Sequence, residues 1–196
     1  MTPRGRVYCA TGNPGKLREF RLAGEVLGIE IEPLTNLKNI PAPEETGATF
    51  EENARLKAAY YSRFAPGPLF ADDSGLEVDA LSGEPGVYSA RYAGADATDE
   101  ANNTLLLRRM EAHTNRAGRF VCVIALAEAG EVLQTFRGEV EGEILRVARG
   151  PGGFGYDPLF FYPPFGCSFG EVDGHRKFDI SHRGVALRKL LKYLAA

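Results

Sequence analysis

Short apolar segments alternate with helical patterns in the first third of the chain, and this alternation constrains the fold more than any other feature. Residues 7–10 form an apolar run, which a glycine-rich turn joins to a helical pattern that contains Leu17 and Phe20. Residues 26–34 are expected to form a second strand, with a break at Gly28. A chain that alternates strands with helices in this way predicts an α/β protein in which helices pack on a central sheet.

A capping box opens the next helix. Thr49 stands three residues before Glu52, the spacing at which a hydroxyl and a carboxylate each accept a backbone N–H of the first turn. Apolar residues then recur at helical spacing through Tyr61, and prolines follow. Residues 69–71 are a short apolar strand, and the Asp-Asp-Ser-Gly sequence at 72–75 predicts a turn after it.

The second half of the chain predicts an antiparallel hairpin. A helix with Thr98 as its N-cap is expected to run to about His113. Residues 119–127 are the longest strand candidate, and a glycine then turns the chain into a second strand over 132–140. Helices between the early strands and a late hairpin predict a mixed sheet, and the length suits a single domain over residues 1–196.

Composition excludes several functional classes. The chain carries 23 Lys and Arg against 26 Asp and Glu, a balance that argues against general binding to a nucleic-acid backbone. No apolar run approaches the roughly 18 residues of a membrane span, so we expect no membrane partner. Cys9, Cys122 and Cys167 form no CxxC pair, which disfavours a disulfide framework or a zinc site and fits a reducing cytoplasm.

A polar loop with two glycines lies between the first strand and the first helix, and it is a candidate phosphate site. Its residues are Thr11, Gly12, Asn13, Pro14, Gly15 and Lys16. Glycines let backbone N–H groups turn toward an anion, and the helix N-terminus adds its dipole. Lys16 is a cation at that positive end, so it needs an anion beside it. A plain strand–turn–helix connection is the alternative, and phosphate binding is favoured over it.

Two adjacent carboxylates follow the apolar strand at 69–71. Ligands bind at the strand ends of an α/β sheet, and Mg²⁺ takes oxygen ligands from one or two carboxylates together with substrate phosphates. Neighbouring residues of a strand face opposite sides, so only one of Asp72 and Asp73 is expected to face a given site. A carboxylate beside a bound polyphosphate predicts a divalent cation between them, whereas a simple Asp-Ser-Gly turn is an equally good interpretation.

Two further groups of polar residues have ordinary interpretations when each is taken alone. Glu44 and Glu45 lie just before the capped helix, and their spacing favours a solvated acidic loop. Asn53 and Lys57 lie four residues apart on one face of that helix, away from its apolar residues. A solvent-exposed polar face is the better interpretation of this pair.

A glycine loop near residue 150 matches GxGxxG letter for letter, but it does not predict dinucleotide binding. No clear βαβ unit precedes residues 150–155, and Tyr156, Asp157 and a proline follow where a helix should begin. Phe154 and Tyr156 offer aromatic faces beside Asp157. Such faces suit a nucleobase and two core aromatic residues equally well.

The last helix is expected to begin near Ser181, with His182 and Arg183 in its first turn. A hydroxyl cap followed by two donors suits an anion or a carbonyl oxygen, or simply a capped and solvated helix start. Lys177, a few residues earlier, is uninformative by itself.

Six stretches, in order along nearly the whole chain, resemble the non-canonical purine nucleoside triphosphate pyrophosphatases, the inosine/xanthosine triphosphatase family. These stretches are residues 10–20 (ATGNPGKLREF), 44–58 (EETGATFEENARLKA), 71–81 (ADDSGLEVDAL), 85–94 (PGVYSARYAG), 152–160 (GGFGYDPLF) and 181–184 (SHRG). One such motif is a weak signal, whereas six in the family's order are highly specific. Residues 166–176 depart from the family pattern, which more often has a helical, Glu-rich run there.

The resemblance implies a curved central mixed sheet flanked by helices, two lobes with a nucleotide cleft between them, and a homodimer. It also implies Mg²⁺-dependent hydrolysis of ITP, dITP and XTP to the nucleoside monophosphate and pyrophosphate, which would remove aberrant purine nucleotides from the pool.

The resemblance assigns roles to individual residues as well. It implies that Asp73 is the general base and a metal ligand, that Glu44 is a second metal ligand, and that Lys57 lies near the phosphates. Residues 11–16 match the family's triphosphate loop. The other implied substrate contacts are Ser74, Phe154, Gly155, Tyr156, Asp157, Lys177, His182 and Arg183. The roles of Asp72 and Glu45 stay open.

Overall fold

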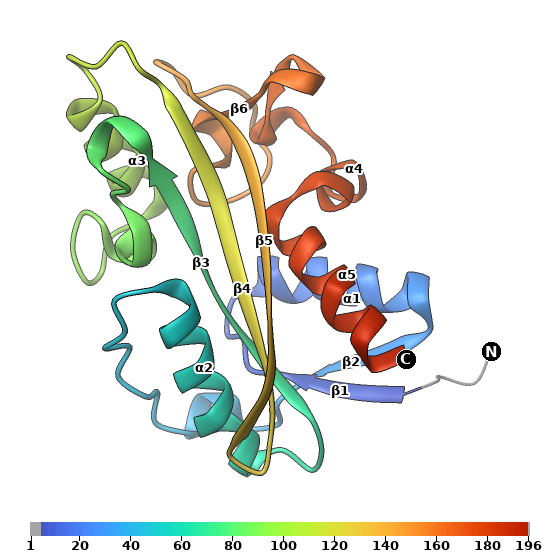
Figure 1. The fold of residues 1–196 in the computed structure, drawn as a ribbon. Coiled ribbons are helices and arrows are strands. Elements are labelled where there is room, and N and C mark those ends of the chain that lie inside the picture. The colour runs from blue at the N-terminus through green and yellow to red at the C-terminus, as the bar shows by residue number, and fades with distance from the viewer. Residues whose placement is uncertain (1–4, 196) are drawn as a thin grey trace.

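A seven-stranded sheet forms the centre of the protein (Figure 1). The computed structural model describes residues 5–195, so residues 1–4 and 196 of the expected domain lie outside the described part. The strands lie side by side in the order β2-β1-β3-β4-β5-β6-β7. Their bounds are β1 Gly5–Cys9, β2 Ile29–Pro33, β3 Leu69–Val78, β4 Ala117–Glu128, β5 Glu131–Ile144, β6 Phe160–Tyr162 and β7 Cys167–Ser168.

The sheet is mixed, as the sequence predicts. β1 pairs in parallel with β2 and β3, and each later pair of neighbours is antiparallel. Parallel strands need long crossovers, and helices α1 (Pro14–Leu27) and α2 (Phe50–Tyr61) lie in these connections. β4 and β5 form the long hairpin, from Glu128 opposite Glu131 to Ala117 opposite Glu143. The α/β class, the mixed sheet and the hairpin are therefore confirmed.

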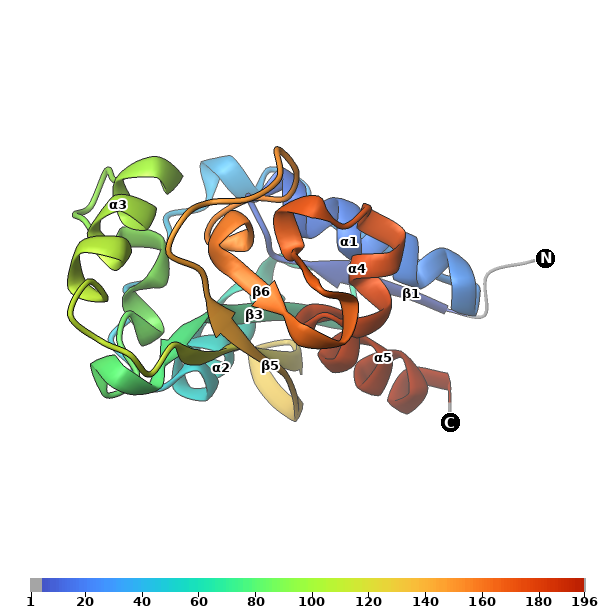
Figure 2. The ribbon, with the colours of Figure 1, turned by 90° about the horizontal axis from the view of Figure 1, so that it is seen from above.

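Helices cover both faces of the sheet. α1, α4 (Gly174–Ile180) and α5 (His182–Ala195) lie on one side, and α2 lies on the other (Figures 1 and 2). α3 (Asp99–Arg109) packs beside the 3-10 segment Gly86–Arg91. The residues implied for the site therefore come from helices on both sides of the sheet.

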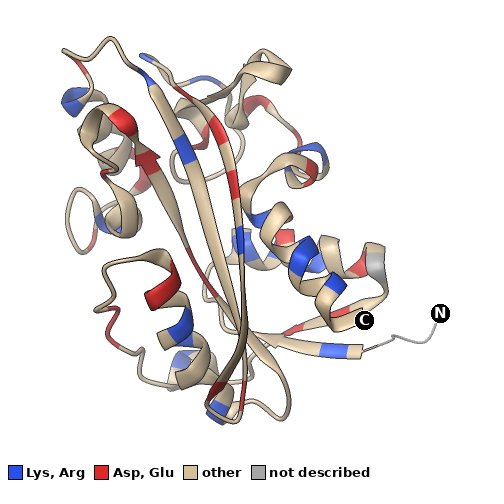
Figure 3. Ribbon diagram, in the orientation of Figure 1, with Lys and Arg blue, Asp and Glu red and all other residues tan. Residues whose placement is uncertain are grey.

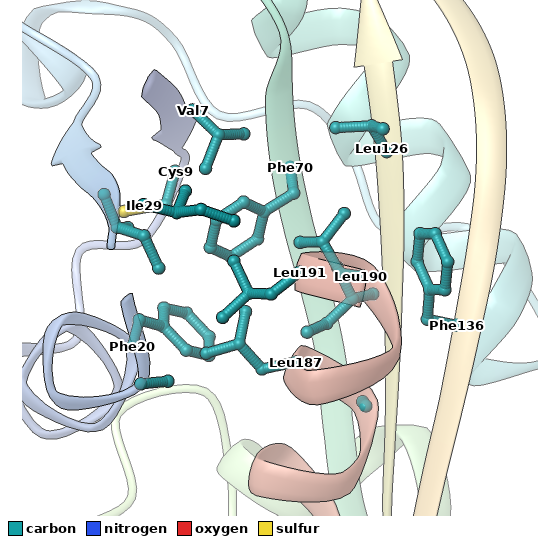
Figure 4. Packing of buried hydrophobic residues seen from close by; sticks show 14 of the residues in the cluster. Val7, Cys9, Phe20, Ile29, Phe70, Leu126, Phe136, Leu187, Leu190 and Leu191 are labelled. Atoms are coloured by element: carbon teal, nitrogen blue, oxygen red, sulfur yellow. The ribbon is translucent and has the colours of Figure 1, made fainter. Parts of the chain in front are cut away.

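A large buried apolar cluster joins α1 and α5 to the sheet (Figure 4). Phe20 on α1 meets Phe70 on β3 edge to face, with ring centroids 5.1 Å apart, and Leu187 and Leu190 of α5 pack in the same cluster. All four side chains are fully buried, and burial of each contributes roughly 2 kcal/mol. Because α1 is held on the sheet in this way, the loop at its start has a defined position beside the end of β1.

The boundary between α1 and β2 differs from the predicted strand over residues 26–34. α1 continues to Leu27, and Gly28 ends it in a left-handed conformation with φ 67°, which glycine adopts without steric cost. β2 begins only at Ile29. Gly28 is therefore a helix C-cap and not an interruption within a strand.

The predicted turn at 72–75 is also wrong, because β3 runs straight through these residues. They pair with residues 121–124 of β4, and this continuous partner outweighs the local turn preference of Asp, Ser and Gly. β1 pairs with β3 only at Leu69 and Phe70. The two carboxylates therefore lie where β1 ends, although β3 itself continues past them.

Two further differences concern the end of one helix and the presence of another. α3 ends at Arg109, short of His113. Residues 174–180 form α4, which the sequence did not predict, with Asp173 accepting two backbone N–H groups of its first turn. α5 begins as predicted, because Ser181 Oγ accepts the third N–H of the helix at 3.1 Å.

Within residues 5–195, no helix has the length and apolar character needed to cross a membrane. Cys9 and Cys122 are fully buried, as their apolar surroundings predict, and Cys167 is half-buried. All three are free thiols. Burial raises the pKa of the Cys9 thiol to about 12, so this side chain is a small apolar core residue rather than a reactive group.

Candidate active site

The loop at residues 11–16 caps the N-terminus of α1. Asn13 is the N-cap, and its Oδ1 accepts the N–H groups of Gly15 at 2.8 Å and Lys16 at 3.1 Å. A proline follows Asn13 at the first helical position, where no N–H partner is needed. Gly12 and Asn13 are exposed, so this edge of the loop is open to a ligand.

The anion beside Lys16 is a carboxylate of the protein itself. Lys16 Nζ lies 2.7 Å from Asp72 Oδ2, and the Asp72 side chain is almost fully buried. Burial alone would raise the pKa of Asp72, but Lys16 and Arg183 outweigh burial and hold that pKa below its usual value. Asp72 is therefore ionised at pH 7, and its carboxylate holds the ammonium of Lys16 beside the end of β1.

Asp73 faces the other side of the sheet, where α2 supplies its partners. Lys57 Nζ donates to Asp73 Oδ1 at 2.9 Å, and Asn53 Nδ2 donates to Asp73 Oδ2 at 3.3 Å. Glu45 Oε1 lies 3.5 Å from the same ammonium. Burial raises the pKa of Asp73 by more than Lys57 lowers it. The two neighbouring carboxylates therefore face opposite sides, as strand geometry predicts, and differ in charge environment.

The donors around Asp73 suit a divalent cation that is shared with a ligand. Glu45 and Asp73 converge on one ammonium, and Glu44 is an exposed neighbour in the same loop. Across the described residues, no group of three or more His, Cys, Asp or Glu side chains forms a complete metal site. Mg²⁺ commonly takes one or two protein carboxylates and fills its shell with phosphate oxygens and water. Asp73 with a carboxylate of the 44–45 loop fits that ion.

The exposed polar face predicted for α2 is wrong. Asn53 is fully buried and the Lys57 side chain is only 13% exposed, because both turn toward β3. Phe50 and Ala54 lie on a second face of the same helix, which is also buried. Helical spacing identifies the polar face but cannot show that Asp73, remote in sequence, lies against it.

A cavity of about 200 Å³ opens on the face of β3 that carries Ser74. The residues around it include Asn13, Lys16, Ser74, Asn102, Phe120, Phe154, Gly155, Tyr156, Asp157 and Arg183. The loops on its two sides touch, since a Cβ at Gly15 would lie 2.9 Å from the Phe154 ring. One ligand in this cavity can therefore contact Lys16 at a charged end and Phe154 at an aromatic end.

The charges at the aromatic end are paired with one another. Lys177 Nζ lies 2.6 Å from Asp157 Oδ2 and 3.3 Å from Glu19 Oε1. Arg183 lies 3.4 Å from Glu19 and donates to Ser74 Oγ at 3.2 Å. These four charged side chains are buried, and burial of a charge is tolerated only when it is paired. Glu19 thus connects α1 to α4 and α5, and the unpredicted helix α4 brings Lys177 into the site.

The two aromatic residues of the glycine loop differ in exposure. Phe154 is half-buried, with Arg183 and Lys177 at 4.9 and 5.0 Å from its ring centre. Tyr156 is buried, and its hydroxyl donates to Ser89 O at 2.8 Å. Phe154 and Tyr156 both line the cavity, Phe154 with a partly exposed ring and Tyr156 from a buried position.

α3 holds the glycine loop from outside. Gly155 N donates to Asp99 Oδ2 at 2.7 Å, and Gly155 O accepts from Asn103 Nδ2 at 3.0 Å. The 3-10 segment Asp157–Leu159 follows the loop and leads into β6. The absence of a helix after residues 150–155 agrees with the rejection of a dinucleotide motif.

His182 adjoins Phe120, which borders the cavity. The two rings stack with centroids 4.8 Å apart and an interplanar angle of 13°. Burial lowers the pKa of His182 well below its usual value, and Arg183 and Lys177 lower it further, so the imidazole is neutral at pH 7. Within residues 5–195, neither ring nitrogen has a hydrogen-bond partner, and the buried His182 ring lies behind Phe120 rather than in the lining of the cavity.

Sequence reasoning missed Glu19 and assigned no role to Asp72. A signal for Glu19 was present, because it lies four residues from both Gly15 and Ala23, on the buried face of α1. A carboxylate at such a position indicates a buried ion pair. The sequence does not reveal its partners, because they lie more than 150 residues away.

Comparison with known proteins identifies the family. Residues 7–193 match the sequence profile of the Ham1 family. The chain belongs to the Ham1 family. It is 53% identical over 198 residues to the dITP/XTP pyrophosphatase of Acidobacterium capsulatum, with 96% of this chain and 97% of the relative covered. The dITP/XTP pyrophosphatase of an Exiguobacterium species is 50% identical over 186 residues, with 94% of each chain covered.

A solved structure in the Ham1 family supports the fold. The HAM1 protein from Coxiella burnetii superposes with a TM-score of 0.87 at 40% sequence identity, covering 100% of this chain and 99% of that chain. The fold described above is therefore shared with that protein over the length of the chain.

Proposed function

We propose that this member of the Ham1 family hydrolyses ITP, dITP and XTP to the nucleoside monophosphate and pyrophosphate, and so removes aberrant purine nucleotides. One observation carries the proposal: a single cavity joins the lysine-bearing loop to Phe154 and Arg183 on one face of β3, and Asp73 projects from the other face of the same strand. The names of the relatives at 53% and 50% identity support the same activity.

The triphosphate binds at the charged end of the site. The backbone N–H groups of Thr11 and Gly12 and the ammonium of Lys16 contact phosphate oxygens, because the N–H groups of Asn13, Gly15 and Lys16 donate within the loop. Asp72 keeps Lys16 in place through the 2.7 Å contact. Lys57, held at 2.9 Å by Asp73, adds a second positive charge for the phosphates.

Glu44 and Asp73 are the proposed ligands of Mg²⁺, with Glu45 as a neighbouring carboxylate. Held there together with the nucleotide, the ion would supply positive charge to the phosphates and to the departing pyrophosphate.

Asp73 is the proposed general base. Its carboxylate accepts a proton from a water molecule as that water attacks the α-phosphorus, and the bond from the α-phosphorus to the bridging oxygen of pyrophosphate breaks. Asn53 and Lys57 orient the carboxylate from α2. Lys16 and Lys57 stabilise the negative charge that moves to the leaving pyrophosphate.

The aromatic end selects the base. At purine C6, hypoxanthine and xanthine carry a carbonyl acceptor, and adenine carries an amino donor. Arg183 can only donate, and neutral His182 has one N–H donor. The amino group of adenine would therefore face these donors with no acceptor opposite it. A hydrogen-bonding site of this kind rejects a mismatched analogue by roughly 10⁴–10⁵-fold. Phe154 adds stacking without telling the bases apart.

The resemblance also supports a homodimer whose subunits each have two lobes with a nucleotide cleft between them, and free thiols fit a reducing cytoplasm. Light scattering at micromolar concentration tests the dimer directly, and a monomeric mass would refute it.

A product assay over ITP, dITP, XTP, GTP and ATP with Mg²⁺ tests the proposed function. We expect pyrophosphate and monophosphate from ITP and XTP, and very slow turnover of ATP. Release of orthophosphate would indicate a γ-phosphate hydrolase instead. Binding of ITP without turnover would indicate a nucleotide sensor.

A further inference from the structure

One buried side chain joins the two segments that carry the proposed metal ligands. Asn53 Oδ1 accepts the N–H of Gly47 at 2.8 Å, and Asn53 Nδ2 donates to Asp73 Oδ2 at 3.3 Å. The Asn53 side chain has no exposed surface. Its amide therefore spans the distance from the loop of Glu44 and Glu45 to the carboxylate on β3.

We infer that Asn53 is the positioning residue of the metal site: it fixes the acidic loop relative to Asp73 and engages one oxygen of that carboxylate. The inference rests on the proposed function. With Oδ2 engaged by Asn53, Oδ1 is the oxygen that can exchange Lys57 for another partner. Groups that orient a ligand in this way typically change metal affinity or activity by about 10–100-fold when removed.

The acidic loop is fastened to α2 at consecutive backbone positions. Beyond the bond from Gly47 to Asn53, the N–H groups of Ala48 and Thr49 donate to Glu52 Oε2 at 2.7 and 3.3 Å. A Cβ at position 47 would lie 2.7 Å from Asn53 Oδ1, a separation that side chains essentially never show. Glycine at 47 is what permits the backbone to approach the amide so closely.

Asn53 does more than begin the helix. Thr49 and Glu52 already form a complete capping box at the start of α2, so the helix end does not depend on the Asn53 amide. The second partner of Asn53 is Asp73, twenty residues further along the chain. Replacing a buried amide whose oxygen and nitrogen are both hydrogen-bonded destabilises the protein whatever the role of the amide. A loss of stability alone therefore does not identify that role.

The test separates positioning from stability with two variants and a matched control. Asn53→Leu has a similar volume and removes both hydrogen bonds. Asn53→Asp keeps an acceptor for Gly47 and replaces the donor to Asp73 by a second carboxylate. Ser62→Ala is the control, because Ser62 is equally buried just past the end of α2 and its Oγ accepts from Gly130 N at 2.9 Å.

The measurements are turnover of ITP and binding of Mn²⁺, followed by electron paramagnetic resonance in the presence of non-hydrolysable α,β-methylene-ITP. For Asn53→Leu we expect Mn²⁺ binding to weaken and kcat to fall by about 10–100-fold, with the nucleotide KM at saturating metal changing far less. Ser62→Ala should lower Tm and leave both measurements unchanged.

The kcat and the Mn²⁺ affinity of the Asn53 variants decide between positioning and a purely structural role. If the Mn²⁺ affinity and the kcat of Asn53→Leu are both within about threefold of the wild-type values, the inference is overturned. If Asn53→Leu does not fold, Asn53→Asp decides: a fall in kcat of about tenfold or more supports the inference, and turnover near wild type overturns it. Failure of the wild-type protein to release pyrophosphate from ITP would overturn the proposed function itself, a result independent of both variants.

Discussion

Asp72 and Asp73 are adjacent on β3 and equally buried, at 5% and 7% exposure, yet they meet opposite electrostatic surroundings. Asp72 faces α1, where Lys16 and Arg183 hold its pKa below the usual value against the effect of burial. Asp73 faces α2, where burial raises its pKa, Lys57 opposes that rise, and Glu45 adds to it. Figure 3 shows basic residues on helices at both sides of the sheet.

The difference shows that the neighbouring charges, rather than the depth of burial, decide what each carboxylate does. Asp72 has a surplus of cations and stays an anion, so it acts as a fixed counter-ion for Lys16. Asp73 shares the ammonium of Lys57 with Glu45. A group in that position can exchange partners, which suits a carboxylate that handles a metal ion or a proton.

The largest effect is expected from Asp73→Asn. The amide has nearly the same shape but is neither a base nor a good Mg²⁺ ligand, so ITP turnover should fall by roughly 10²–10⁴-fold. Nucleotide binding should remain measurable. Steady-state kinetics with ITP and Mg²⁺ provides the measurement. Turnover within a factor of a few of wild type would remove Asp73 from the mechanism.

Asp72→Asn should instead act on stability. The change leaves the ammonium of Lys16 without its partner at 2.7 Å, and loss of one member of a buried pair costs on the order of 3 kcal/mol. Urea unfolding at pH 7 measures the loss, with Asp73→Asn as the matched control. That variant should lose less stability, because burial raises the pKa of Asp73 and Glu45 stays beside Lys57. An Asp72 variant as stable as the Asp73 variant would contradict the assignment of distinct roles.

Local signals predicted the parts of the molecule that local interactions determine. The capping box at Thr49 and Glu52, the hairpin and the start of α5 are all confirmed. Each depends on residues within a few positions or on one tight turn, so the sequence contains the complete signal.

The failures involve partners that are distant in sequence. Residues 72–75 form a strand because β4 lies beside them, and Asn53 and Lys57 are buried because Asp73 lies against α2. Tertiary contacts override local preference in both cases. The resemblance to a family supplied roles for Lys57 and Lys177, but no sequence pattern indicated their partners.

A smaller effect should distinguish the two lysines that face these carboxylates. Lys16→Met leaves the ionised and buried Asp72 without its closest cation, with Arg183 and Lys57 still near it. Lys57→Met leaves Asp73 without its ammonium partner, but the raised pKa of Asp73 makes protonation easier. Lys16→Met should therefore lose about 2 kcal/mol more of unfolding free energy than Lys57→Met. Urea unfolding at pH 7 compares them, and equal losses would show that the surroundings of the two carboxylates are equivalent.

The smallest effect concerns His182, which lies near the same cations as Asp72. Lys16 and Arg183 lower the pKa of Asp72, which keeps that anion charged, and together with burial they lower the pKa of His182, which keeps the imidazole neutral. The unfolded chain then binds a proton at His182 below about pH 6.5, while the folded chain does not. The contribution of neutral His182 to the free energy of unfolding is therefore fully present above that pH. It falls as the pH drops toward the lower folded pKa, by at most about 1.4 kcal/mol for each pH unit.

His182→Phe keeps an aromatic ring against Phe120 and removes the titration. Urea unfolding from pH 7.5 to 5 should show a shallower acid loss for this variant. The other two histidines cancel in the difference, and parallel profiles would show that His182 is protonated as easily in the folded protein as in the unfolded chain.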